Sequence, residues 1–137
     1  MGRILSIDLG TKRTGLAVTD VLKLIANPLD TIPTQQLEMF LKNYLSKEQV
    51  ETIVIGLPRK LDSSDNEMTP KVMALKSRLE KIFPGLKLAL VDERFTSKMA
   101  LHSMIEMGSK KKDRREKEGN LDKISATIIL QSYLQQQ

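Results

Sequence analysis

Residues 3–9 and 14–19 are two short apolar segments that a four-residue turn joins. So short a connection predicts two strands that pair antiparallel. Alternation in the first strand places Asp8 on the same face as Ser6, between apolar neighbours that indicate burial on both sides. Because an unpaired buried carboxylate is strongly destabilising, Asp8 requires a partner: a cation, a metal ion, or turn amides in a purely structural role.

The turn itself contains two small residues and two cations, Gly10, Thr11, Lys12 and Arg13. Small residues leave backbone N–H groups accessible, and the cations complement negative charge. The turn therefore suits a phosphate group. The segment 58–64, which follows a later apolar strand, has no GxxxxGK[ST] pattern, and this argues against nucleotide hydrolysis of the Walker type.

The rest of the chain alternates between strand and helix periodicity. We expect a third strand at 29–32 between two prolines, and a helix at 34–47 capped by Thr34. Further elements are expected as strands at 51–57 and 86–91 and helices at 70–83, 96–107 and 121–134. Three antiparallel strands followed by two helix-linked parallel strands predict an α/β fold with a mixed five-stranded sheet flanked by helices. This order is compatible with the RNase H-like fold.

The composition limits the possible classes of protein. With 137 residues and 40% hydrophobic content, residues 1–137 are expected to form one domain. The chain has no cysteine, which excludes disulfides and thiolate chemistry. No signal peptide or membrane-spanning run is recognised, so a cytoplasmic protein is expected. The net charge of +5 favours a polyanionic partner such as nucleic acid.

Residues 108–119, GSKKKDRREKEG, are dense in both charges. Such a run predicts a mobile solvated loop, and Lys110, Lys111 and Lys112 would also suit contacts to a nucleic-acid backbone. Asn120 is then expected to cap the last helix, with Asp122 in its first turn. There Asp122 would either stabilise the helix dipole, by about 0.3–1 kcal/mol, or point inward towards the sheet.

Three acids thus occupy unusual inward positions: Asp8, Asp122, and either Glu93 or Asp92 at the end of the last strand. Strand alternation favours Glu93 over Asp92 as the neighbour of Asp8. Carboxylates without histidine or cysteine select hard ions, Mg²⁺ or Mn²⁺. Two such ions can activate a water molecule and stabilise the leaving oxygen of a phosphodiester.

Four segments in order resemble the YqgF (RuvX) family: ILSIDLGTKRTGLAVTD, IGLPRKLDSS, VDERFTS and LDKISATIILQSYL. This family has the RNase H-like fold, is similar to the Holliday-junction resolvase RuvC, and is implicated in maturing the 5′ end of pre-16S rRNA. The resemblance implies that Asp8, Glu93 and Asp122 are the acidic catalytic and metal-binding residues. It implies substrate contacts for four further residues: Lys12, Arg13, Arg94 and Thr96. Two departures are Ser63, where the family commonly has glycine, and Ser97, where it has threonine.

The leading hypothesis is a divalent-metal-dependent nuclease that processes the 5′ end of pre-16S rRNA, with possible ribosome-associated partners. The main alternative substrate is branched DNA, for which a resolvase would act as a two-fold dimer. The sequence leaves monomer and homodimer open. A kinase or ATPase of the actin and hexokinase type is a weaker alternative, since only one of its two RNase H-like halves would fit. A non-catalytic RNA-binding ribosome-assembly factor would share the same fold and charge.

Overall fold

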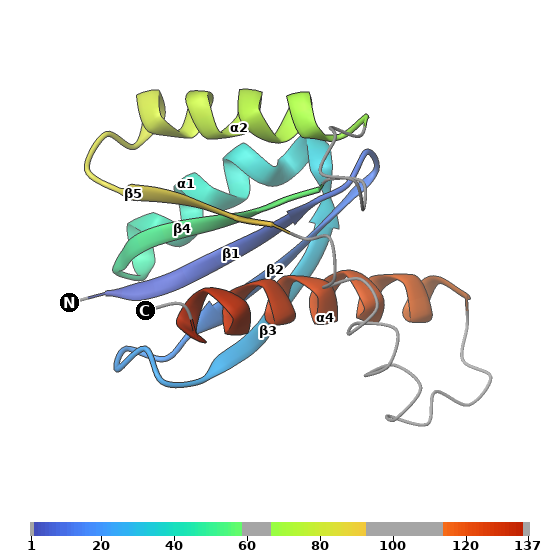
Figure 1. Ribbon diagram of the computed structural model, residues 1–137, viewed down its shortest axis with the longest axis horizontal. Helices are drawn as coiled ribbons and strands as arrows, with labels where there is room; N and C mark the ends of the chain where they lie inside the picture. The colour runs from blue at the N-terminus through green and yellow to red at the C-terminus, as the bar shows by residue number, and fades with distance from the viewer. Residues whose placement is uncertain (1, 59–66, 93–113, 136–137) are drawn as a thin grey trace.

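The structure is a computed structural model that describes residues 2–58, 67–92 and 114–135, with the side chains of the last segment described from residue 123. Five strands form one mixed sheet in the order β3-β2-β1-β4-β5 (Figure 1). The strands are β1 Arg3–Leu9, β2 Arg13–Thr19, β3 Ala26–Pro33, β4 Val50–Leu57 and β5 Lys87–Asp92. The first three pair antiparallel, whereas β4 pairs parallel with β1 and β5. The predicted sheet is confirmed.

Helices cover both faces of this sheet (Figure 1). Helices α1 (Leu37–Lys47) and α2 (Thr69–Ile82) lie on one face, and a short 3-10 helix, η1 (Thr34–Gln36), precedes α1. Helix α4 (Arg114–Gln135) lies on the other face, where it contacts mainly β1, β2 and β3. Among the described residues, no helix combines the length and the apolar character needed to cross a membrane.

The alternation in β1 separates two hydrophobic cores, as the sequence predicts. Leu5 and Ile7 belong to the core beneath α1 and α2, whereas Ile4 belongs to the core beneath α4. Both cores contain fully buried aliphatic side chains from β4, namely Ile53 and Ile55 on the first side and Val54 on the second. The central strands β1 and β4 are therefore buried on both faces, which is typical of a parallel pair between helix layers.

Two predicted boundaries are wrong near residue 30. The third strand begins before Pro28 and ends at Pro33, so it contains a proline that was expected to bound it; β3 lies at the end of the strand order, where proline is tolerated. Thr34 does not cap α1 either. The chain makes the 3-10 turn first, and Gln36 occupies the N-cap position without a side-chain hydrogen bond. The hydroxyl group of Thr34 has a different role, described below.

Helix α4 begins at Arg114, well before the predicted start at Leu121. Asn120 and Asp122 therefore lie inside the helix, so the predicted cap and the first-turn position of Asp122 are both wrong. The segment that was predicted as loop contains Arg, Lys and Glu, which are good helix formers. The helix expected at 96–107 lies outside the described residues.

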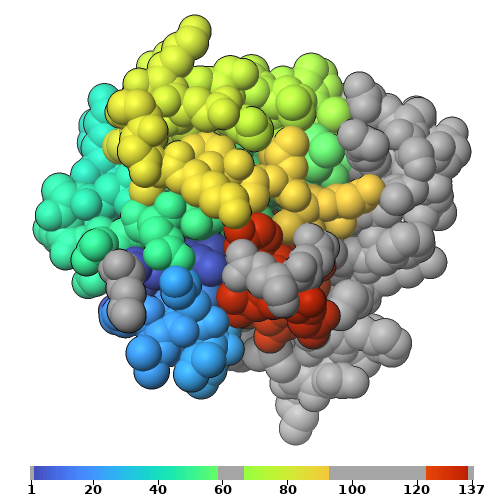
Figure 2. Space-filling view, turned by 60° about the vertical axis from the view of Figure 1, so that its left-hand side comes forward, coloured from blue at the N-terminus to red at the C-terminus, as the bar shows by residue number. Residues whose placement is uncertain are grey.

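The β2–β3 connection and the α2–β5 connection lie at the same end of the molecule. Figure 2 shows this end, with the blue β2–β3 hairpin below, the green start of β4 beside it and the yellow end of α2 above. This end is opposite to the one at which the parallel strands β1, β4 and β5 terminate (Figure 1).

Candidate active site

Asp8 lies near the carboxyl end of β1, on the face that α4 covers, and its side chain is half-buried. Its register partner on β2 is Gly15. On the other side, Ile7 pairs with Ile55 of β4, so the next position along β4, beside Asp8, is Gly56. Both glycines are buried. The Asp8 carboxylate therefore stands between two strand positions that carry no side chain, and glycine inside a strand often marks a close approach of a ligand or another backbone.

A buried hydrogen bond fixes α4 close to β1. The hydroxyl group of Ser6 donates to the carbonyl oxygen of Ala126 at 2.6 Å, and neither residue is accessible to solvent. The small side chain of Ala126 allows this close approach. The contact defines how the helix is positioned along the strand.

That contact also places the backbone of residue 122 relative to Asp8. Helix α4 runs in the direction opposite to β1 (Figure 1). Asp8 is two residues beyond Ser6, about 6.6 Å along the strand. Asp122 is four residues before Ala126, about 6 Å along the helix in the same direction. The backbone of residue 122 on α4 therefore lies at the level of Asp8 on β1, and the Asp122 side chain lies outside the described residues.

Asp92, the alternative third acid, lies on the face of the sheet opposite to Asp8. It is the last residue of β5 and is exposed. Val91 belongs to the core beneath α4, whereas Leu90 packs against the core beneath α1 and α2. By alternation Asp92 shares the face of Leu90, opposite to Asp8. The next residue, Glu93, lies outside the described residues.

The basic turn between β1 and β2 is held by hydrogen bonds to Thr34. The Thr34 hydroxyl donates to the Gly10 carbonyl at 2.7 Å, and the Thr34 N–H donates to the Lys12 carbonyl at 3.0 Å. The hydroxyl also lies 2.9 Å from that of Thr14. Gly10 is required here, because a Cβ would collide with the Arg13 carbonyl oxygen. The turn thus has a fixed backbone.

The two cations of this turn, Lys12 and Arg13, are exposed. They lie at the edge of the sheet where β1 ends, close to Asp8 in the chain. The structure therefore brings together Asp8, the basic turn and the backbone of residue 122. The remaining predicted substrate contacts lie outside the described residues: Arg94, Thr96, Lys110, Lys111 and Lys112.

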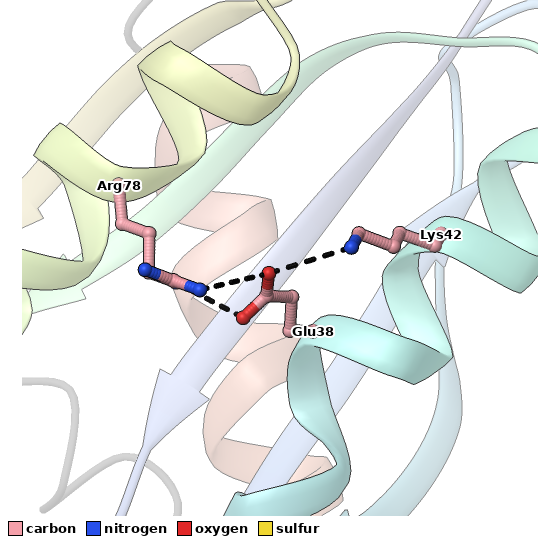
Figure 3. A network of polar contacts seen from close by, with 3 residues as sticks. All are labelled: Glu38, Lys42 and Arg78. Atoms are coloured by element: carbon pink, nitrogen blue, oxygen red, sulfur yellow. Dashed lines mark hydrogen bonds and ion pairs between the residues drawn. The ribbon is translucent and has the colours of Figure 1, made fainter.

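Two other carboxylates, Glu38 and Glu51, have clear structural partners. Glu38 on α1 accepts two hydrogen bonds from Arg78 on α2, at 3.0 and 3.1 Å, and pairs with Lys42 at 3.6 Å (Figure 3). The hydrogen bonds from Arg78 lower the pKa of Glu38 below its ordinary value. The Lys23 ammonium, 2.7 Å away, likewise lowers the pKa of Glu51. These acids stabilise contacts between elements.

Sequence reasoning missed four residues that shape the site: Ser6, Gly15, Thr34 and Gly56. The signal for the glycines was available, because glycine inside an apolar strand often marks a close approach of a ligand or a backbone. The roles of Ser6 and Thr34 depend on contacts with residues distant in sequence, Ala126 and Gly10. No local pattern predicts those contacts.

The donor chemistry of the site fits a hard divalent cation. The described side chains alone contain no group of three residues that would hold a metal ion. That set excludes the side chains of Glu93 and Asp122. Asp8 supplies carboxylate oxygen, the donor that Mg²⁺ and Mn²⁺ prefer, in a half-buried position beside two glycines.

The fold and the site define a class of protein. A mixed sheet with three antiparallel and two parallel strands, an acid near the end of the central strand and a helix crossing opposite to it are the features of the RNase H-like fold. A solved structure with this fold, "T. thermophilus RuvC in complex with Holliday junction substrate", matches with a TM-score of 0.51 and 17% identity, covering 96% of each chain.

Sequence comparison then identifies the family. The family model RuvX, described as Holliday junction resolvase, matches residues 2–136. A Flavobacterium johnsoniae protein named "Putative pre-16S rRNA nuclease" is 50% identical over 98% of this chain and 96% of its own length. A Bacteroides thetaiotaomicron protein of the same name is 50% identical over 98% of this chain and 97% of its own. The chain belongs to the RuvX family, as its sequence motifs predict.

Proposed function

We propose that this chain is a nuclease that hydrolyses phosphodiester bonds in the precursor of 16S rRNA, in the cytoplasm. Relatives with half of their residues identical over nearly the whole chain carry a name with this substrate. The observation that carries the proposal is the position of Asp8. It is a half-buried carboxylate between two glycines, opposite the backbone of another acid and next to a fixed basic turn.

In this proposal Asp8, Glu93 and Asp122 are the catalytic residues, and they would hold two Mg²⁺ or Mn²⁺ ions. Glu93 is chosen over Asp92 because Asp92 shares its face with Leu90, away from Asp8. The ions, when bound, supply an activated water and stabilise the leaving oxygen. The three carboxylates provide the negative charge that holds the ions in place.

The remaining residues bind and position the nucleic acid. Lys12 and Arg13 are exposed on a turn whose backbone Thr34 fixes, so their charges are presented to phosphate groups from a defined position. Arg94, Thr96, Lys110, Lys111 and Lys112 would extend this contact along the strand. The net charge of +5 attracts the polyanion at long range. Gly15 and Gly56 leave room for the scissile phosphate beside Asp8.

The proposal is tested by incubating the purified protein with precursor 16S rRNA fragments, with Mg²⁺ or Mn²⁺ and with EDTA. Asp8→Asn is the active-site variant, and Asp92→Asn is the matched control on the opposite face. We expect metal-dependent cleavage by the native protein and the control, and none by Asp8→Asn. Cleavage by Asp8→Asn at the native rate would contradict the proposal.

A four-way DNA junction is the second substrate in the same experiment, because the family model is described as Holliday junction resolvase. Preferential cleavage of the junction would replace the RNA substrate with branched DNA while keeping the same catalytic residues. Tight RNA binding that is unaffected by Asp8→Asn, without any cleavage, would instead indicate a non-catalytic assembly factor.

A further inference from the structure

An apolar groove lies at the end of the molecule that Figure 2 shows. It lies between the end of α1, the start of β4 and the α2–β5 connection, and its volume is about 430 Å³. This volume is near the lower end of the range for binding sites, so the groove accommodates a few side chains of a partner. Most of the side chains that line it are apolar: Leu45, Val50, Ile82, Phe83 and Leu86.

The walls of the groove have a fixed backbone. Helix α1 ends with a hydrogen bond from the Glu48 N–H to the Tyr44 carbonyl at 2.8 Å. Helix α2 ends with one from the Phe83 N–H to the Leu79 carbonyl, also at 2.8 Å. The turn after α2 is closed by the Leu86 N–H, which donates to the Phe83 carbonyl at 3.1 Å. Because the groove is formed in advance, binding requires little ordering of the chain.

Three glutamates line the groove or lie within two residues of its lining, and each has a basic partner. The pairs are Glu48 with Arg3 at 3.4 Å, Glu51 with Lys23 at 2.7 Å, and Glu80 with Lys76 at 3.2 Å. The negative charge around the groove is therefore already neutralised by the chain itself.

Three lysines beside the groove are not neutralised in this way. Lys47, Lys81 and Lys87 are exposed, and each is next in sequence to a residue that lines the groove. Within the described part of the chain, no carboxylate lies within ion-pair distance of any of them. Lys47 and Lys81 also complement the helix dipole, since they lie in the last turns of α1 and α2. Lys87 begins β5 and has no such role.

The surroundings of the groove are therefore net positive, and two further groups do not change the sign. Asp20, on the neighbouring β2–β3 hairpin, adds one negative charge, and two backbone N–H groups donate to its carboxylate at 2.9 Å. The network of Glu38, Lys42 and Arg78 between α1 and α2 adds one positive charge (Figure 3). Two copies of this face would meet with like charges, which disfavours a second copy as the occupant.

We propose that the groove binds a segment of a partner protein in which apolar side chains are flanked by aspartate or glutamate. The apolar side chains fill the groove, and the carboxylates pair with Lys47, Lys81 and Lys87. RNA matches the lysines but not the lining, because the lining is mainly aliphatic and the ring of Phe83 packs against the core beneath α1 and α2. The candidate active site, at the opposite end of β1, stays accessible, and the proposal does not depend on nuclease activity.

The test begins with a displayed library of random twelve-residue peptides, which is selected on the immobilised full chain without any assumption about sequence. The most enriched peptide is then synthesised with a fluorescent label and titrated with the full chain by fluorescence anisotropy. Titrations at several salt concentrations measure the electrostatic part of the affinity.

Two variants alter the groove. Gly85→Glu adds a carboxylate to its lining, and an added Cβ at Gly85 meets no atom within 4 Å, so this variant is expected to fold normally. A combined Lys47→Ala, Lys81→Ala and Lys87→Ala variant removes the unpaired charge. Lys71→Ala is the matched control, because Lys71 is an exposed lysine on α2 about 15 Å along the helix from Lys81. Thermal melting checks folding, and Lys87→Ala alone replaces the combined variant if that one is unfolded.

We expect the enriched peptides to combine acidic with apolar residues. Their affinity should fall by about tenfold or more for Gly85→Glu and for the combined lysine variant, and should be unchanged for Lys71→Ala. Salt should weaken binding to the native chain more than binding to the combined lysine variant, since only the native chain has the three charges.

The proposal would be overturned if no peptide is enriched, if the enriched peptides lack acidic residues, or if they bind Gly85→Glu as tightly as the native chain. A single-stranded RNA that displaces the peptide and binds more weakly to Gly85→Glu would assign the groove to RNA instead. A dimer of the native chain in sedimentation equilibrium that Gly85→Glu abolishes would assign it to a second copy.

Discussion

The two faces of the sheet are built from residues of different size. Beneath α1 and α2 the described strands contribute large aliphatic side chains: Leu5, Ile7, Leu16, Val18, Ile53, Ile55 and Leu57. Beneath α4 the corresponding positions are mostly small or polar: Ile4, Ser6, Asp8, Gly15, Ala17, Val54, Gly56, Ala89 and Val91. Both faces are covered by helices, yet the described core beneath α1 and α2 contains more large buried aliphatic side chains than the one beneath α4.

The difference means that one face of the sheet mainly stabilises the fold, whereas the other contains the candidate active site. The α1 and α2 face buries the larger apolar area, which is the main favourable contribution to folding. On the α4 face, Ser6 brings the helix close to the strand while the glycines keep space beside Asp8. The Asp8 side chain is only half-buried there, which lowers the cost of keeping a carboxylate in the strand. The following predictions test this division, beginning with the largest expected effect.

Asp8→Asn should reduce metal-dependent cleavage by more than about 100-fold, since it removes a charged ligand rather than a supporting contact. Thermal stability should stay the same or rise, because like charges crowd the site when no ion is bound. Asp92→Asn, on the other face, should cleave at close to the native rate. Initial rates and melting temperatures check both parts, and equal losses in the two variants would contradict the division between the faces.

Ile55→Ala should lower the free energy of unfolding by about 2–5 kcal/mol, because it leaves a cavity in the core beneath α1 and α2. Cleavage per folded molecule should be unchanged, since the substitution does not alter the α4 face. Urea denaturation and cleavage assays at low temperature check this. A variant that is stable but inactive would show that the two faces are not independent.

Gly15→Ala should lower cleavage but raise stability, the reverse of the effects expected for Ile55→Ala. A methyl group on β2 would lie about 4.5–5.5 Å from the Cβ of Asp8, so cleavage and Mg²⁺ affinity should fall, by about tenfold. Stability should rise by about 0.5–1 kcal/mol, because alanine loses less backbone entropy than glycine in a strand. Metal titrations and melting curves measure the two effects. Unchanged metal affinity would mean that the space beside Asp8 has no function.

Thr34→Val should weaken substrate binding severalfold, because the turn that presents Lys12 and Arg13 loses the hydroxyl hydrogen bond to Gly10. The loss in stability should be about 1 kcal/mol, as for a typical hydrogen bond. Thr34→Ser keeps the hydroxyl and should restore binding. Binding curves at several salt concentrations distinguish loss of phosphate contacts from general unfolding, since only the former reduces the salt dependence. Failure of the serine variant to restore binding would exclude the hydroxyl as the cause.

Glu38→Gln should have the smallest effect, and only on stability. Arg78 lowers the pKa of Glu38 below its ordinary value of 4.5 in the folded state. The stability from this ion pair is therefore present above the unfolded pKa and is lost as pH falls through the lowered one. The native chain should be slightly more stable than the variant at neutral pH, and the two should converge in acid. Urea denaturation at both pH values measures this, and a difference that persists in acid would contradict the assignment.

The sequence predicted the antiparallel and parallel pairings because a short turn joins the first two strands and because β4 is a nearly continuous apolar run. It predicted the two faces of β1 because period-2 alternation is local. It failed at the start of α4, where a dense charge pattern indicated a loop although its residues favour helix. It also assigned Thr34 to a cap, since the hydrogen bond to Gly10 joins residues on different elements. For the site, it selected Asp8 and the basic turn but not the glycines that border the carboxylate.

By itself, the sequence determined which residues face which side of the sheet, that Asp8 must be accommodated in a buried strand, and to which family the chain belongs. These properties follow from side-chain alternation and from the cost of burying charge. Only the tertiary structure decided which glycines flank Asp8 and where α4 crosses β1. Those relations depend on strand register and helix docking, which are set by contacts between residues as distant as Ser6 and Ala126.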